Sequence, residues 1–287
     1  MHPARSLILF TTLSGLGFGL LAFLCLGLPP LTSWAAVFFF GLAFVMAGAG
    51  LIASTFHLGH PERALKAFTQ WRSSWLSREA WLATAALAAA GLYAAALIFA
   101  DTRVAPLGWL AAVLSLATVY ATSMIYAQLK TVPRWHHWST SALFLALALA
   151  GGALLSGQAW PAIVLILGAG VLQFYAWKTG DRRLADSGTT LATATGLGAR
   201  GEVRAFEPPH TGPNYLTREM VFVVARKHAL KLRSIALVLA FLVPSLLLLL
   251  PYTLSLAAAA HLAGVLMLRW LFFAEAEHVV GLYYGKR

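Results

Sequence analysis

The chain has 287 residues, of which 60% are hydrophobic and only 11% are charged, and its formal net charge is +11. Because a soluble domain carries about a quarter charged residues, this composition excludes a water-soluble protein and predicts an all-α integral membrane protein. We expect no nucleic acid as a partner, since no nucleic-acid-binding motif accompanies the charge and basic loops beside anionic membrane lipid account for it.

Eight apolar segments follow one another along the chain and predict a bundle of eight transmembrane helices, because about 20 apolar residues cross a bilayer. They are Ser6–Leu28, Trp34–Phe56, Ala80–Ala100, Leu107–Ala127, Ser139–Leu155, Ala159–Trp177, Ile235–Leu250 and Leu254–Phe273. The first segment is too long for the core of a secretory signal peptide and lacks a small-residue cleavage site, so we expect a retained helix. Residues 1–287 then form a single membrane domain with one long loop at about 178–234.

The basic residues sort to one side of this predicted bundle. If the spans alternate in direction, one face receives both termini and the loops after the second, fourth and sixth spans. That face holds all of the 21 Lys and Arg residues except Arg103. Because Lys and Arg resist translocation across the membrane, the asymmetry predicts that both termini lie in the cytoplasm.

A histidine and a glutamate stand at the same membrane boundary. His57 follows the second span and Glu79 precedes the third. A histidine exchanges a proton near neutral pH, and a carboxylate can relay one to bulk water. A site for a lipophilic quinone requires such polar groups and such a proton route. Structural roles remain open: Ser77 as the cap of the third helix, with Glu79 in the favoured first turn, and a hydrogen bond from His57 to a carbonyl group.

Arg269 lies about two turns inside the last apolar segment. An arginine there is costly unless it reaches the interface or finds a negative partner. Glu79, Glu275 or a bound ligand would serve, so structural pairing and functional use both remain open.

We expect no metal site, haem or iron–sulfur cluster in this chain. A single cysteine, Cys25, cannot build a four-cysteine site. Of the nine histidines only His261 is clearly embedded in a span, without a second histidine at its depth to bind haem. A transporter is the alternative from a different class. A transporter would favour charged groups near the midplane and internal sequence repeats. The internal similarity in this chain is limited to the four residues Leu76–Glu79, which resemble Leu216–Glu219.

The segment His57-Leu58-Gly59-His60-Pro61-Glu62-Arg63-Ala64, followed by Trp75-Leu76-Ser77-Arg78-Glu79, resembles the signature of the dimethyl sulfoxide reductase anchor-subunit family. The residues Met1–Ala4, Lys130–Trp135 and Arg269–Phe273 also resemble this family. The resemblance therefore spans the whole chain.

This resemblance implies an eight-helix anchor, in the inner membrane of a bacterium, for a molybdenum-cofactor catalytic subunit and an iron–sulfur subunit. Such an anchor passes electrons between the iron–sulfur subunit and the quinone pool, either ubiquinone or menaquinone. The histidine and acidic residue of the family's quinone site map to His57 and Glu79. We add Arg63 and Arg269 to the predicted quinone-binding residues because of their charge and depth.

The side of the membrane separates two subtypes of this family. Dimethyl sulfoxide reductases of this type carry the catalytic subunits outside the cytoplasm, whereas the related sulfite-oxidising complexes hold them inside. The boundary at His57 carries the basic loops and is therefore expected to face the cytoplasm. With catalytic subunits on that side, the resemblance implies the sulfite dehydrogenase subtype, in which sulfite oxidation reduces quinone. The alternative within the family is the anchor of a quinol-oxidising terminal reductase.

Overall fold

The computed structural model describes residues 1–56, 60–207, 209, 210, 212, 214–221 and 228–285, and within them the chain forms helices and no strands. The long helices are α1 (Arg5–Cys25), α2 (Ser33–Thr55), α3 (Trp75–Ala100), α4 (Ala105–Ala127), α5 (Trp138–Leu155), α6 (Ala159–Gly180) and α11 (Leu254–Ala274). The shorter ones are η1 (Pro61–Phe68), α7 (Arg183–Asp186), α8 (Leu191–Thr195), η2 (Gly198–Arg200), η3 (Leu216–Met220), α9 (Ala229–Leu237), η5 (Val238–Leu242), α10 (Val243–Leu247) and η6 (Val279–Tyr284).

Eight helical stretches in the described part of the chain are long and apolar enough to cross a membrane, which confirms the predicted number of spans. The seventh is composite, because α9, the π-helical turn η5 and α10 follow one another without a break. Two spans begin more than one helical turn earlier than predicted, the third at Trp75 and the seventh at Ala229. Their added turns carry Lys or Arg, whose long apolar stems let a helix continue through the membrane interface.

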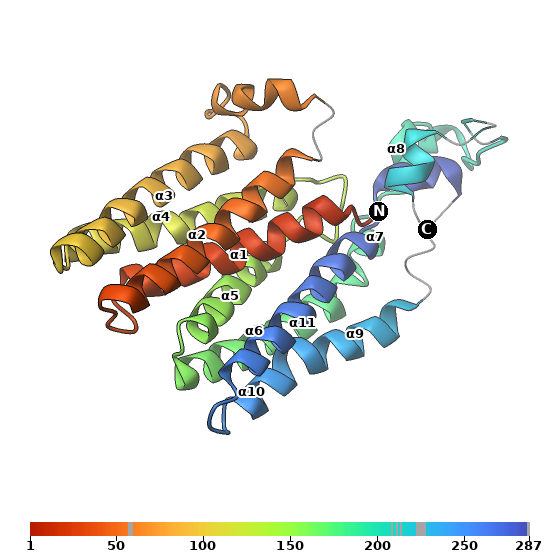
Figure 1. Cartoon of the computed structure of the whole chain (residues 1–287). Helices are drawn as coiled ribbons and strands as arrows, with labels where there is room; N and C mark the ends of the chain where they lie inside the picture. The colour runs from red at the N-terminus through yellow and green to blue at the C-terminus, as the bar shows by residue number, and fades with distance from the viewer. Residues whose placement is uncertain (57–59, 208, 211, 213, 222–227, 286–287) are drawn as a thin grey trace.

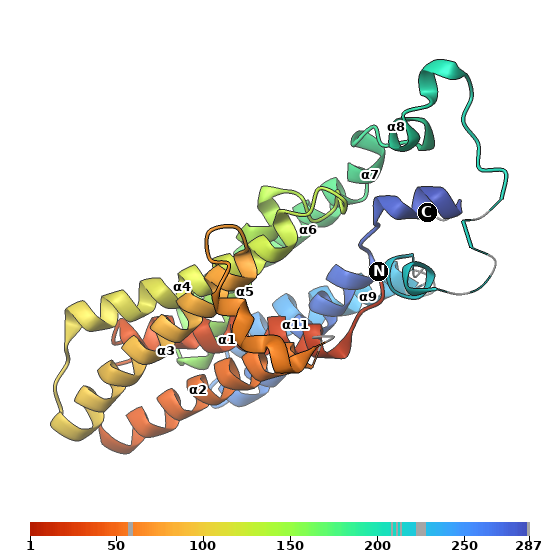
Figure 2. The same ribbon diagram turned by 90° about the horizontal axis from the view of Figure 1, so that it is seen from above.

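Both chain termini lie at the same end of the bundle (Figure 1), where the Met1 ammonium group donates to the Ala276 carbonyl oxygen at 2.7 Å. This end also carries η1, the α4–α5 connection and the segment with α7 and α8. We call it the basic end, because these segments hold many of the Lys and Arg residues of the chain. Figure 2 shows α7 and α8 continuing from α6 beyond the bundle. Arg103 lies at the opposite end, where its guanidinium group approaches the turn at Gly27.

Helix α1 forms the centre of the bundle, where it packs against α2, α4, α5 and α11. Small residues let the backbones approach closely. A Cβ atom at Gly19 would lie 1.9 Å from the Ala148 carbonyl oxygen in α5, and one at Gly50 would lie 2.4 Å from the Ser14 nitrogen in α1. Because lipid tails are as apolar as the side chains, such close packing is a main source of attraction between spans.

The seventh span is joined to α11 through the embedded histidine. His261 is 1% exposed, and its Nδ1 donates to the Ala240 carbonyl oxygen at 2.7 Å. Pro244 stands four residues after Ala240 and has no N–H to donate to that carbonyl. His261 therefore gives this carbonyl a donor from the neighbouring span, at a point where the helix has no N–H four residues on. Gly264, on the same helix, has no Cβ to hold the two backbones apart at this point.

Candidate functional site

Glu79 lies in the second turn of α3 and is buried inside the bundle, with 4% of its surface exposed. Its carboxyl group forms a short hydrogen bond with the Thr122 hydroxyl of α4. The same hydroxyl lies 3.0 Å from the Thr118 carbonyl oxygen. Since a hydroxyl has one proton and can also accept, Thr122 donates to an ionised Glu79 or accepts from a protonated one. The pair accommodates both protonation states of Glu79.

Ser77 does not cap α3, so that structural alternative is wrong. The helix begins at Trp75 with Ser74 in the cap position, and no acidic residue occupies its first turn. Ser77 is the third helical residue, and its buried hydroxyl has no hydrogen-bond partner in the described structure. The burial of Glu79 is therefore not explained by stabilisation at a helix terminus.

Tyr126 stands one turn after Thr122 on α4, in a cluster of aromatic side chains. The phenol interacts electrostatically with both Glu79 and Arg269. Four ring centroids lie 5.3 to 5.8 Å from that of Tyr126, those of Trp135, Phe144, Phe272 and Phe273. Tyr126 thus interacts with both the buried acid of α3 and the buried base of α11.

Arg269 is 4% exposed, and its guanidinium carbon lies 3.6 Å from the centre of the Phe144 ring. This contact stabilises a cation over the face of an aromatic ring. The Nε atom has no hydrogen-bond partner among the described residues. Neither predicted carboxylate pairs with Arg269, because Glu79 bonds Thr122 and Glu275 binds two other arginines. The buried cation therefore has hydrogen-bonding capacity that the described residues leave unused.

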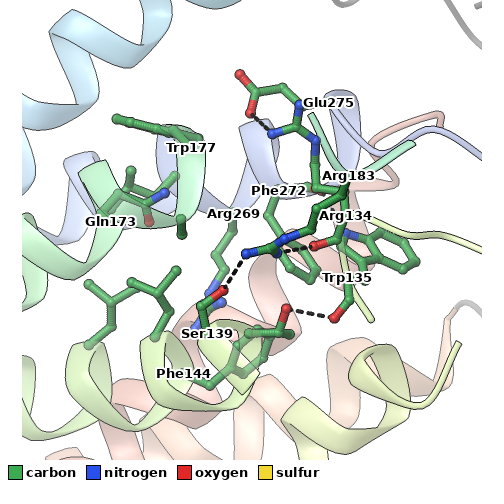
Figure 3. Close-up of a pocket in the computed structure, with 15 residues that line it drawn as sticks. Arg134, Trp135, Ser139, Phe144, Gln173, Trp177, Arg183, Arg269, Phe272 and Glu275 are labelled. Carbon is green, nitrogen blue, oxygen red and sulfur yellow. Dashed lines mark hydrogen bonds and ion pairs between the residues drawn. The ribbon is translucent and has the colours of Figure 1, made fainter. Parts of the chain in front are cut away.

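A cavity of about 50 Å³ lies beside Arg269 (Figure 3). Arg269 reaches it from α11, Ser139 from α5 and Gln173 from α6. A cavity of about 150 Å³ is known to take benzene, and a single water needs far less. This space therefore has room for water but not for an aromatic ring.

Four charged side chains close the basic end of the bundle above this cavity. Arg233 donates to Glu275 at 2.6 Å and to both oxygens of Asp181 at 2.6 and 2.8 Å. Arg134 also donates to Asp181 at 2.6 Å. The hydrogen bonds from Arg233 and Arg134 hold the pKa of Asp181 at about 2, below its ordinary value of 3.8. This ion network fastens α6, α9, α11 and the α4–α5 connection to one another.

The structure brings together two of the four residues predicted from the sequence. Glu79 and Arg269 both interact electrostatically with Tyr126, whereas Arg63 has an exposed side chain on η1. His57 lies outside the described residues. Sequence reasoning missed Thr122 and Tyr126, although their spacing of four residues on an apolar helix places them on one face.

Two comparisons relate the chain to known proteins. It matches the family described as DMSO reductase anchor subunit (DmsC) over residues 1–285. It is also 33% identical to a sulfite dehydrogenase subunit of Allochromatium vinosum, over 325 aligned positions that cover 99% of both chains. Both matches take in all eight spans and the segments around His57, Glu79 and Arg269.

Proposed function

Because the chain belongs to the DMSO reductase anchor-subunit family, we propose that it carries electrons between an iron–sulfur partner subunit and the membrane quinone pool. The chain is a multi-pass membrane protein and an anchor subunit of this type of complex. In our proposal the iron–sulfur subunit docks on the basic end, with a molybdenum-cofactor catalytic subunit behind it.

The buried, partly unsatisfied guanidinium group of Arg269 is the observation that carries this proposal. A quinone ring presents two carbonyl oxygens, which are hydrogen-bond acceptors, and Arg269 Nε is a donor without a described partner. The neighbouring Glu79 adds a group that can bind or release a proton. The groups present therefore offer the hydrogen bonding that a quinone needs, and we propose that its ring lies toward Glu79 rather than in the cavity of about 50 Å³, which admits only water.

A quinone, when bound, supplies an acceptor for two electrons and two protons. Arg269 would hold one ring oxygen through its free donor. Glu79 would deliver a proton to the ring, and the Thr122 hydroxyl would stabilise the resulting carboxylate by donating to it. We propose, from the family resemblance, that His57 donates to a ring oxygen, and that Arg63 lies at the mouth of the site. The fixed positive charge of Arg269 would also stabilise the negative charge that electrons bring into a buried site.

We test the site in the purified complex by replacing Glu79 with glutamine. General acid–base catalysis contributes about 10²- to 10⁴-fold, so quinone-linked turnover should fall at least ten-fold. Turnover with an artificial electron acceptor should persist, because that acceptor bypasses the anchor. The matched control is Glu62→Gln, the same change at an exposed position of the same bundle end. Normal quinone turnover in Glu79→Gln would contradict the assignment.

Replacing His57 with glutamine should have the same signature, with quinone reduction lost and oxidation of the substrate by an artificial acceptor intact. For Arg269→Gln the control is Arg103→Gln, which changes the same residue type at the opposite end of the bundle. We expect the quinone concentration for half-maximal turnover to rise only in the Arg269 variant. Equal effects of the two arginine changes would argue for a general loss of stability.

We further propose that the basic end faces the cytoplasm of a bacterium and that the complex oxidises sulfite there. The proposal is supported by the basic residues at this end and by the relative that is described as a sulfite dehydrogenase subunit. A single cysteine introduced at position 200, in a Cys25→Ser background, tests the orientation. It should react with a membrane-impermeant reagent only after the cells are opened. Reaction in intact cells would favour the alternative, a quinol-oxidising terminal reductase with external catalytic subunits.

A further inference from the structure

A second and larger cavity opens at the basic end, where α6 meets α7 and the α4–α5 connection. Its volume is about 730 Å³. The charged residues that line it are Lys130, Lys178, Arg182, Arg183 and Asp186. Four of these residues are Lys or Arg and one is Asp, so the cavity carries an excess of positive charge.

Three of the cations are available for a ligand. Lys130, Lys178 and Arg182 are exposed, and within the described structure their side chains form no ion pair or hydrogen bond. The fourth, Arg183, is held rigidly by the structure instead. It donates to Thr179 at 2.6 Å and to His137 at 2.9 Å. The cavity therefore combines one fixed wall with three uncommitted positive charges.

The outer face of α6 leads from this cavity into the apolar part of the membrane. Only 17% of the apolar stretch of α6 is buried inside the bundle. Val171 and Phe174 are 73% and 62% exposed on this helix, one to two turns before Lys178. Tyr175 packs against the exposed Trp138 with ring centroids 5.6 Å apart, a pair typical of the membrane interface.

We propose that this cavity binds the phosphate headgroup of an anionic membrane phospholipid. Lys130, Lys178 and Arg182 contact the headgroup, and the acyl chains lie along Val171 and Phe174. A continuous surface that changes from apolar to basic fits a lipid, whereas a free phosphate ion would have no use for the apolar part. A basic recess between spans is a known type of lipid headgroup site. The bound lipid links α6 to the α4–α5 connection, and it does so whether or not the chain reduces quinone.

Native mass spectrometry of the purified full-length chain tests the proposal, with phosphatidylglycerol and phosphatidylcholine as probes. We compare the wild type with Lys130→Gln/Lys178→Gln/Arg182→Gln and with the control Arg200→Gln/Arg204→Gln/Arg218→Gln. The control removes the same charge from exposed positions of the same loop region. Each basic residue near an anionic lipid surface contributes about 1 kcal/mol. Phosphatidylglycerol affinity should therefore fall by about 100-fold in the first variant, which lacks three such residues, and little in the control.

Three outcomes would overturn the proposal. Equal loss of affinity in both triple variants would mean that general charge attracts the lipid. Displacement of phosphatidylglycerol by inorganic phosphate alone would indicate a site for a soluble anion. Loss of a partner subunit when the first variant is purified as the complex, with lipid binding of the chain unchanged, would indicate that the cavity receives an acidic protein segment. Thermal unfolding of each variant in detergent, expected to match the wild type, confirms that the chain still folds.

Discussion

Replacing His261 with leucine tests whether this histidine completes the hydrogen bonding of the seventh span. The substitution keeps an apolar side chain of similar volume but removes the donor to the Ala240 carbonyl oxygen, which Pro244 cannot replace. The carbonyl then loses its donor from α11, and the proline four residues on supplies none.

The size of the effect follows from two opposing changes. Leaving a buried carbonyl unsatisfied costs about 1–3 kcal/mol, although hydrogen bonds between spans are worth only about 0.6 kcal/mol on average. The Nε2 atom of His261 has no partner in the described structure, so leucine also removes one unsatisfied buried group. We expect the free energy of unfolding to fall by about 1 kcal/mol.

A double-mutant cycle separates this hydrogen bond from general packing. Alanine at position 244 restores the N–H that proline lacks, so the Ala240 carbonyl regains a donor within its own helix. In the Pro244→Ala background, His261→Leu should therefore cost little or nothing. Equilibrium unfolding of the chain in mixed micelles, as sodium dodecyl sulfate is titrated in, measures each free energy through tryptophan fluorescence. A cost equal in both backgrounds to within about 0.5 kcal/mol would refute the reasoning.

Two further predictions concern the ion network and the helix packing. Hydrogen bonds from Arg233 and Arg134 lower the pKa of Asp181 from 3.8 to about 2. An acid with a lowered pKa stabilises the fold above its unfolded pKa, and that contribution is lost as the pH falls from about 4 to about 2. The melting temperature of the wild type in detergent should therefore fall more over this interval than that of Asp181→Asn, and parallel curves would count against the network. Gly19→Leu should prevent α1 from packing on α5, because a Cβ there meets a carbonyl oxygen at 1.9 Å, whereas Gly15→Leu enters open space. We expect well-folded, monodisperse protein in detergent only from the Gly15 variant, and normal yield of Gly19→Leu would show that the contact adjusts.

The amino-acid sequence by itself determined the number of spans and the separation of charge between the two bundle ends. The physical reason is that backbone groups in lipid must form hydrogen bonds within their own helix. The helical structure of each apolar stretch can therefore be predicted from that stretch alone. The ends of spans were less predictable. The third and seventh begin one to two turns early because Lys and Arg stems extend a helix into the interface.

The tertiary structure alone decided how the buried polar groups pair. The sequence offered Glu79 and Glu275 as partners for Arg269, yet one bonds Thr122 and the other binds Arg233. It also gave no sign that Thr122 faces Glu79, since a hydroxyl in an apolar span can simply bond the carbonyl four residues before it. Spans that are apolar on every side do not reveal which face turns inward. Only close packing of small residues sets the rotation of each helix, and with it the groups that meet at the candidate site.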